Sequence, residues 1–386
     1  MVKFVSIIFF SILALIFAVT FLSIGDTSSS PEIDSALKRI ALNVIKEAVD
    51  TSKSIEEAAE KVGVDPDELG RLCYALDIDI DFAPPKVEPV PLLPSELLSN
   101  SDYDLDVILS CKGNSPYVLL VDKTTHNLHL LHYNSGKRTL IETFKCKTGK
   151  NPGDKMEEGD HKTPEGVFFL VNKYSRKQIL EIVGKNIAYQ YGEMAFATNF
   201  PNYLNRIDGK NGSGIWLHGT DEDFDETSAY DTRGCVVVTN ETIKSLSKYI
   251  ELQKTPLIIE EMLKFSKTKD HSAQSQKLLE ILEGWRSNWE IKQIDEYIQY
   301  YSPHFKDSKK RNLSEYKNYK ASIFNNFKIN HIKLDDIIVF KHNDAIIAQF
   351  IQDYSASNIK KSIGLKTLYL VKNKDTWKII GEKIPR

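Results

Sequence analysis

The stretch Thr232-Arg233-Gly234-Cys235-Val236-Val237-Val238 decides how the middle of this 386-residue chain is interpreted. Its thiol stands between a glycine and an apolar run typical of a strand, and the pair His218-Gly219 lies a short way upstream. A thiol that attacks a carbonyl carbon needs a base and hydrogen-bond donors for the oxyanion that develops. We therefore expect an acyl transfer reaction in which His218 is the base and the backbone N–H groups of Gly234 and Cys235 are the donors.

Three other residues are expected to support this site. A free thiol has a pKa of about 8.5 and is mostly protonated at neutral pH, so the positive charge of Arg233 would favour the thiolate. Thr232 and Gly219 flank the nucleophile and the base and are assigned supporting roles. Taken singly, Cys235 and His218 would be interpreted as ordinary buried residues. Their combination in one motif is what indicates catalysis.

Residues 116–262 carry the apolar runs of a mostly β domain. One helix is expected late in this domain, from about residue 242 to residue 252. The expected strands include residues 117–121, 128–132, 139–141, 166–171, 215–217, 235–238 and 256–259. The motif around Cys235 is therefore expected at the beginning of a strand, directly after a turn.

On these residues the domain resembles the YkuD-type L,D-transpeptidase catalytic domain, whose signature is a His-Gly pair followed by Ser/Thr-His/Arg-Gly-Cys. Further support comes from Val121-Asp122-Lys123, Thr148-Gly149-Lys150 and the run from Gly159 to Gly166. The resemblance implies that peptidoglycan stem peptides are the substrate. It implies that the thiol attacks a tetrapeptide at the carbonyl of its third residue and releases the terminal D-Ala. Val237 stands where the family usually has arginine, so no substrate contact is assigned to it.

Three residues are candidates for substrate contact. Asp221 and Asp223 belong to an acidic loop that would attract the free ammonium of a diaminopimelate-type donor, although a solvated loop is the favoured interpretation. His161 lies in the turn between residues 159 and 166 and is a candidate for lining the cleft.

No metal and no cofactor are expected. The histidines at positions 126, 129 and 132 resemble a metal triplet, but a strand would place His129 and His132 on opposite faces. Cys73, Cys111 and Cys146 are too few and too scattered for a zinc site or a disulfide scaffold. Some of these three cysteines could pair in an exported protein, whereas a catalytic Cys235 must stay free.

Residues 1–25 are expected to direct export. Residues 4–25 carry no charge, follow a single Lys3 and are long enough to span a bilayer, while Ser23 and Gly25 are small residues that suit cleavage. Both a signal peptide and an inner-membrane anchor stay open, so the protein is expected to be periplasmic or anchored to the cytoplasmic membrane facing the periplasm. The net charge of −3 offers no basic field and argues against a nucleic-acid partner.

Two segments precede the catalytic domain. Residues 31–82 have the periodicity of a small helical module. Residues 54–69 resemble a helix-turn-helix and also the helical half of a LysM glycan-binding module, but a helix pair that packs or self-associates is favoured. Prolines cluster between residues 83 and 95 and predict a stiff linker, which we place at residues 83–115.

Residues 273–386 follow a polar linker near residues 267–272 and combine an amphipathic helix with four late strands. Helices followed by a curved meander resemble the NTF2-like cone, so the fold class of the chain is α+β. Such cones serve as enzymes, ligand pockets or dimer surfaces, and no acid–base pair stands out here. Because exposed aromatic residues need cover, we expect a homodimer through a face that bears Tyr369, Val371 and Trp377, with a wall-peptide pocket as the alternative.

The domain combination resembles the cell-shape peptidoglycan enzymes of curved and helical bacteria. The leading function is that of an L,D-transpeptidase, in which the acyl group passes from Cys235 to an amine of a neighbouring stem peptide. The alternative is an L,D-carboxypeptidase, in which water accepts the acyl group and a tetrapeptide is trimmed to a tripeptide. A third hypothesis, from another class, is a non-catalytic wall-binding or assembly protein.

Overall fold

The computed structural model of the chain describes residues 42–52, 55–66, 69, 73, 78, 94–111, 117–134, 136–224, 230–357, 359–374 and 376–383. The chain divides into two compact units, residues 1–91 and residues 92–386. The export segment expected at residues 1–25 lies outside the described residues. Among the residues that are described, no helix has the length and apolar character needed to cross a membrane.

The first unit contains a small helical core, as expected. Residues 42–50 are helical, and α3 (Ile55–Val62) follows them. The apolar positions of α3 recur at helical spacing, and Ala58, Ala59 and Val62 are buried against Ile45 and Val49 of the preceding helix. Glu56 and Glu57 lie in the first turn of α3, where carboxylates stabilise a helix.

The second unit begins with the catalytic domain, whose sheet has eight strands in the order β11-β9-β8-β7-β12-β3-β4-β5. Most neighbours are antiparallel, but β12 pairs with β3, and β11 with β9, in parallel. The strands are β3 (Tyr117–Asp122), β4 (Asn127–Asn134), β5 (Lys137–Lys145), β7 (Gly166–Ser175), β8 (Met194–Thr198), β9 (Trp216–His218), β11 (Val236–Val237) and β12 (Pro256–Glu260).

Short elements surround this sheet. The parallel pair β6 (Thr148–Gly149) and β10 (Tyr230–Thr232) leads into the Cys235 turn. The helices are α6 (Arg176–Val183), the 3-10 turn η1 (Ala188–Tyr191), α7 (Tyr203–Ile207) and α8 (Asn240–Leu246). The helix expected at residues 242–252 is therefore α8, which begins two residues earlier and ends six residues earlier than the sequence indicated.

The central strands of the catalytic sheet, such as β3 and β12, are buried on both faces, which explains their continuous apolar runs. In β3, Leu119 and Val121 point into a core that α8 covers with Ile243. The alternate residues Val118 and Leu120 point into a second core. That second core is shared with the C-terminal sheet, which contributes Ile338, Phe340, Ile347 and Tyr369.

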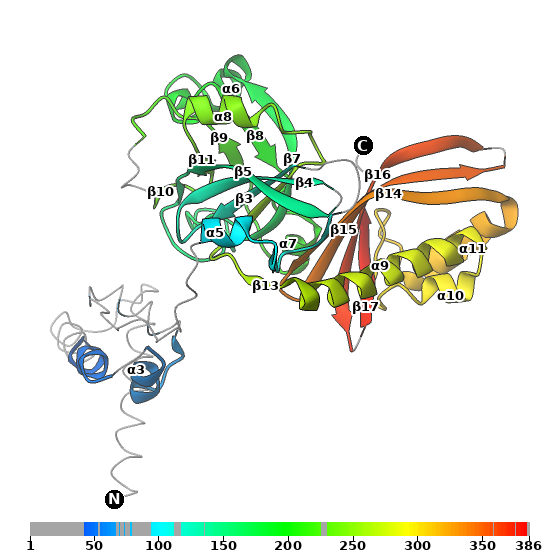
Figure 1. The fold of residues 1–386 in the computed structure, drawn as a ribbon, viewed down its shortest axis with the longest axis horizontal. Coiled ribbons are helices and arrows are strands. Elements are labelled where there is room, and N and C mark those ends of the chain that lie inside the picture. The colour runs from blue at the N-terminus through cyan, green and yellow to red at the C-terminus, as the bar shows by residue number, and fades with distance from the viewer. Residues whose placement is uncertain are drawn as a thin grey trace, which may run out of the picture. The chain divides into compact units, whose positions relative to one another are not determined.

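The C-terminal domain is an NTF2-like cone, as expected (Figure 1). Its sheet has the order β17-β16-β15-β14-β2, and the helices lie along one face of the sheet. The apolar face of α9 carries Leu278, Leu282, Trp285 and Trp289 at helical spacing. The elements are α9 (Thr268–Glu290), α10 (Ile294–Ile298), α11 (Leu313–Asn326), β14 (Ile329–His342), β15 (Ala345–Ala356), β16 (Ile359–Asn373) and β17 (Thr376–Lys383).

The linker prediction is wrong for residues 94–111. They form α5 (Pro94–Ser99), β1 (Tyr103–Leu105) and β2 (Ile108–Cys111), and β2 becomes the edge strand of the C-terminal sheet by pairing with β14. The physical reason is the apolar run of β2, which is buried throughout. The second linker, near residues 267–272, is also wrong, because β13 (Phe265–Lys267) and the first turn of α9 occupy it.

The aromatic face expected to be open is covered from within the chain. Tyr369 is 1% exposed, and its ring stacks on Tyr203 of α7 with centroids 5.1 Å apart. Trp377 instead packs towards the helices, on the opposite side of the sheet. Tyr369 is therefore not available to form a dimer, and the homodimer itself stays a prediction.

Candidate active site

Cys235 occupies the turn between β10 and β11, and its half-buried side chain lies where the motif placed it. Gly234 makes this turn with a φ of +121°, a conformation that favours glycine. A Cβ atom on Gly234 would lie 2.6 Å from the carbonyl oxygen of Lys162. The turn therefore depends on glycine both for its dihedral angle and for the close approach of the loop at residue 162.

Thr232 holds the turn from inside. Its hydroxyl donates to the carbonyl oxygen of Cys235 at 2.8 Å and accepts from the N–H of Gly234 at 3.0 Å. The Gly234 N–H is therefore engaged in this structure, and its role as an oxyanion donor stays a prediction. The role of the Cys235 N–H as a donor stays a prediction.

His218 lies at the end of β9, beside β11, with Val237 opposite it in the parallel register. Cys235 lies directly before β11, and Cys235, Val237 and His218 all line one cavity. The imidazole is buried and its Nδ1 donates to the carbonyl oxygen of Gly219 at 2.7 Å. This contact leaves Nε2 with the lone pair that a general base needs. Gly219 is required here, because a Cβ atom on it would lie 2.3 Å from Oδ1 of Asn240.

Burial makes both members of the pair neutral at physiological pH. It lowers the pKa of His218 to about 4, with the Gly219 hydrogen bond acting in the opposite direction. It raises the pKa of Cys235 to about 11, although the backbone of Trp216 and the charges of Arg233 and Lys155 lower it. Arg233 therefore acts on the thiol as expected, but burial outweighs it.

Both residues line one cavity of about 420 Å³. The ring of Tyr191 lies 4.6 Å from that of His218 and 5.3 Å from that of Trp216, which fixes the imidazole against an aromatic wall. Arg233, Thr232, Lys147, Lys150, Asp231, Thr220, Glu222 and Asp223 also line it. The sequence did not indicate Tyr191 or Lys147, because no motif marks them. Tyr191 is the last residue of η1, and Lys147 directly precedes β6.

The three substrate candidates separate in the structure. Asp223 is exposed and lines the cavity. Asp221 is not among the lining residues; it pairs with Arg176 at 2.9 Å and accepts from Nδ2 of Asn240 at 2.8 Å, which makes it a structural brace. His161 is exposed and does not line the cavity either.

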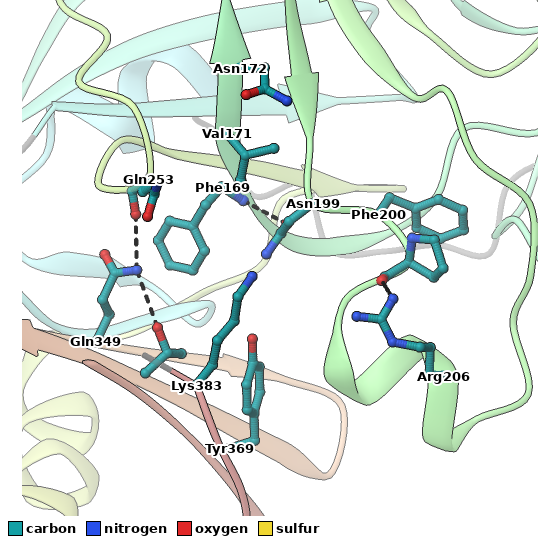
Figure 2. Close-up of a pocket in the computed structure, with 12 residues that line it drawn as sticks. Phe169, Val171, Asn172, Asn199, Phe200, Arg206, Gln253, Gln349, Tyr369 and Lys383 are labelled. Atoms are coloured by element: carbon teal, nitrogen blue, oxygen red, sulfur yellow. Dashed lines mark hydrogen bonds between the residues drawn. The ribbon is translucent and has the colours of Figure 1, made fainter. Parts of the chain in front are cut away.

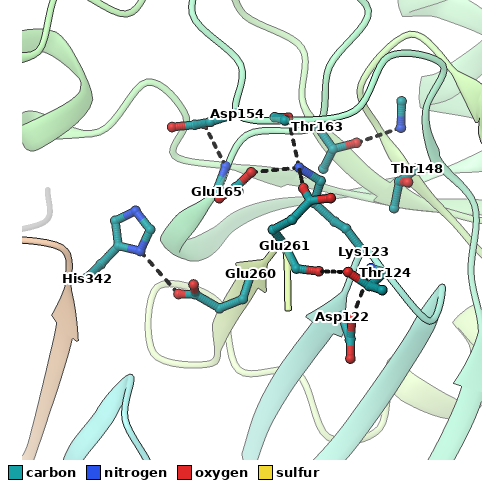
Figure 3. Close-up of polar contacts among 12 residues, drawn as sticks. Asp122, Lys123, Thr124, Thr148, Asp154, Thr163, Glu165, Glu260, Glu261 and His342 are labelled. Carbon is teal, nitrogen blue, oxygen red and sulfur yellow. Dashed lines mark hydrogen bonds and ion pairs between the residues drawn. The ribbon is translucent and has the colours of Figure 1, made fainter. Parts of the chain in front are cut away.

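A buried lysine supports the loop that packs against Gly234 (Figure 3). Lys123 is 1% exposed and pairs with Glu165 at 2.8 Å and Glu261 at 2.7 Å. It also donates to the carbonyl oxygen of Gly153 at 2.8 Å. Asp154 accepts from the N–H of Glu165 at 2.9 Å. These contacts tie both ends of residues 153–165 to the sheet and so hold the carbonyl of residue 162 against the catalytic turn.

The histidines outside the site have other surroundings. His129 is buried with Nδ1 2.9 Å from Oγ1 of Thr143, and burial lowers its pKa to about 4. His132 stacks on Tyr117 with centroids 4.8 Å apart. No group of three metal-binding side chains occurs among the described residues. All four cysteines are free thiols.

A buried charge cluster in the cone was also missed. Lys366 pairs with Glu382 at 2.8 Å, and the hydroxyl of Tyr301 donates to the same carboxylate. Lys320 lies 4.0 Å from the ring centroid of Trp289, and burial lowers the pKa of Lys320 to about 7. These residues are far apart in the sequence, so no motif could have joined them.

A thiol in the turn before β11 and a neutral imidazole on the adjacent strand β9, lining one cavity, are typical of cysteine enzymes that transfer acyl groups. Comparison with protein families identifies the family within this class. Residues 116–259 match the L,D-transpeptidase catalytic domain, and residues 277–383 match the Cds6 C-terminal NTF2-like domain. The chain belongs to the L,D-transpeptidase family and carries an NTF2-like domain after the catalytic one.

Two solved structures resemble the chain over nearly their whole length. Bd1075 from Bdellovibrio bacteriovorus is 31% identical, with a TM-score of 0.62, and the match covers 73% of this chain and 98% of that one. The helical cell shape determining protein Pgp2 from Campylobacter jejuni is 28% identical, with a TM-score of 0.56, over 74% of this chain and 96% of that one. A search of curated proteins found no match.

Proposed function

We propose that this protein modifies peptidoglycan stem peptides through an acyl-enzyme at Cys235. The thiol attacks the carbonyl carbon of the third residue of a tetrapeptide, and the bond to the terminal D-Ala breaks. The observation that carries this proposal is that Cys235, in the turn before β11, and His218, at the end of β9, line one cavity of about 420 Å³. The family match supports the same substrate class.

The protonation states set the order of events. Because the thiol and the imidazole are both neutral, the Sγ proton moves to Nε2 of His218 as the carbon–sulfur bond forms. The resulting imidazolium keeps its Nδ1 hydrogen bond to the Gly219 carbonyl. His218 then donates the proton to the amine of the departing D-Ala, and a thioester remains on Cys235.

The acceptor is proposed to be an amine of a second stem peptide, which gives a cross-link. Glu222 and Asp223 line the cavity and would attract an ammonium group. Asp231 also lines it but pairs with Lys147 at 3.4 Å, and Lys150 and Arg233 add positive charge. The second candidate is hydrolysis to a tripeptide. It is supported by the match to Pgp2, a protein named for helical cell shape, over 96% of its length.

The test is incubation of the purified protein with disaccharide tetrapeptides, followed by separation of the products by mass. Dimers that lack one D-Ala support transfer to an amine, whereas tripeptides support hydrolysis. Cys235→Ala is the control and should give neither product. If the unchanged protein also gives neither product, the non-catalytic wall-binding hypothesis is favoured instead.

We propose further that the protein acts outside the cytoplasmic membrane. This proposal rests on the uncharged residues 4–25 and on the location of the proposed substrate. The test is a fusion after residue 30 of a reporter enzyme that is active only outside the cytoplasmic membrane. We expect this fusion to be active. Activity of a second reporter, one that works only in the cytosol, at the same fusion point would contradict both the proposed location and the wall substrate.

A further inference from the structure

A second cavity, of about 390 Å³, lies at the seam between the catalytic domain and the C-terminal sheet (Figure 2). It shares no lining residue with the catalytic cleft. Phe169 and Phe200 of the catalytic domain and Tyr369 of β16 give it an apolar aromatic floor, and all three are buried. Its size is in the range of sites for small organic molecules.

The seam cavity is positively charged. Arg206 from α7 and Lys383 from β17 both line it, and no aspartate or glutamate does. No ion pair joins either cation to a carboxylate within the described part of the chain. Burial and the charge of Arg206 lower the pKa of Lys383, which indicates that the two cations are close enough to repel each other. A bound anion would offset this repulsion.

The hydroxyl of Tyr369 also points into the seam cavity. Tyr369 is 1% exposed, yet its hydroxyl makes no hydrogen bond with any described residue. Figure 2 shows this hydroxyl directed towards the cavity and Lys383. Because burial raises the pKa of Tyr369 to about 12, the phenol remains a hydrogen-bond donor at neutral pH. The hydroxyl is therefore available to donate to a ligand in the cavity.

The side-chain amides of Asn199 and Gln349 also line the seam cavity, and their hydrogen bonds show which of their N–H groups are free to donate. Oδ1 of Asn199 accepts from the N–H of Phe169 at 2.9 Å, so the amide nitrogen of Asn199 is left to face Lys383, as Figure 2 shows. Gln349 is held by hydrogen bonds from Nε2 to the carbonyl of Gln253 at 3.1 Å and to Oγ1 of Thr367 at 3.4 Å. Arg206 donates from Nη1 to the carbonyl oxygen of Pro201, which leaves its other N–H groups free of bonds to any residue that the structure describes. These N–H groups and the donors of Asn199, Tyr369 and Lys383 are available to a ligand.

We propose that the seam cavity binds the carboxylate group of a small organic ligand, with Lys383, Arg206, Tyr369 and Asn199 as donors and the aromatic floor against the carbon skeleton of the ligand. The catalytic cleft differs in charge, because three acidic and three basic side chains line it. The proposal does not depend on the reaction at Cys235. Two sources have the same chemistry: a free dicarboxylate and a carboxyl group of a stem peptide.

The test is titration calorimetry on the full chain carrying Cys235→Ala, so that no probe is turned over. The probes are succinate, its uncharged diamide, inorganic phosphate and a disaccharide tetrapeptide. Succinate or the tetrapeptide should bind, and the diamide should not. Binding of succinate assigns the site to free carboxylates, whereas binding of the tetrapeptide alone assigns it to the stem peptide.

Single substitutions locate the binding. Tyr369→Phe removes only the hydroxyl and keeps the ring on Tyr203, and Lys383→Met removes only the charge. Each should weaken the carboxylate affinity by about tenfold or more. Lys372→Met is the matched control, because Lys372 is an exposed cation on the same sheet that does not line this cavity. Unchanged affinity in both variants, no binding of either carboxylate probe, or binding of phosphate alone would overturn the proposal.

Discussion

The thiol of Cys235 donates to the carbonyl oxygen of Gly214, with Sγ 3.3 Å from that oxygen. The nucleophile is therefore held as a protonated thiol by the backbone, in the absence of substrate. His218 makes its own contact, with Gly219. We therefore expect the proton to leave the thiol only when the substrate carbonyl is in place.

Alkylation of Cys235 as a function of pH tests this protonation state. Since burial raises the pKa of the thiol to about 11, the rate of reaction with iodoacetamide should rise about tenfold per pH unit between pH 7 and pH 10. Cys235→Ala gives the background from the other three cysteines. A rate that is already constant above pH 7 would indicate a preformed thiolate–imidazolium pair and would contradict the account.

The pH dependence of turnover tests His218 separately. Burial lowers the pKa of His218 to about 4, so the imidazole is neutral and able to accept a proton at every pH above that value. Turnover should be nearly constant between pH 5.5 and 9 and should fall as pH drops towards 4. His218→Ala should reduce turnover by at least about 100-fold, whereas His132→Ala, outside the cleft, should not. A loss of activity centred near pH 6.5 would indicate an unburied base.

Gly234→Ala should distort the catalytic turn. The new Cβ would meet the Lys162 carbonyl at 2.6 Å while the backbone keeps a φ of +121°. Gly136→Ala is the matched control, because Gly136 also has a positive φ, of +82°, but nothing within 4 Å of the added atom. Both variants should lose about 1 to 3 kcal/mol of unfolding free energy from backbone strain. Only Gly234→Ala should lose most of its turnover, and equal activity of the two variants would show that the close approach is unimportant.

Tyr203→Ala should weaken the seam between the two domains. The substitution removes the stack on Tyr369 and the hydrogen bond from the Tyr203 hydroxyl to the Ile380 carbonyl, at 2.7 Å. We expect a loss of about 2 to 4 kcal/mol in unfolding free energy, from the aromatic contact, the buried area and the hydrogen bond together. Tyr189→Ala, at a side chain 44% exposed, is the control for thermal unfolding. Equal midpoints for both variants would mean that the seam does not contribute to stability.

The catalytic motif was predictable because its chemistry is local. The turn at Gly234, the strand after it and the base at His218 lie within one short segment, and in the structure Cys235 and His218 line one cavity. The order of the domains and the four-stranded meander were also predicted correctly, since turns and apolar alternation mark them.

The contacts between domains could not be predicted in the same way. The prolines before residue 95 predicted a linker at residues 83–115, which is too long. Nothing in the sequence shows that β2 pairs with β14, more than 200 positions later. For the same reason Tyr369 seemed exposed: its partner Tyr203 lies in another domain. The Lys366–Glu382 pair and the seam cavity likewise depend on residues that only the tertiary fold brings together.

The most direct test of the central claim is the intact mass of the protein quenched with acid during turnover of a disaccharide tetrapeptide. The account predicts an adduct whose added mass is that of the substrate minus D-Ala, which hydroxylamine removes, as expected for a thioester. The adduct should map to the peptide that contains Cys235 and should be absent from Cys235→Ala. Turnover without any such adduct, or the same adduct in Cys235→Ala, would contradict the assignment of Cys235 as the nucleophile.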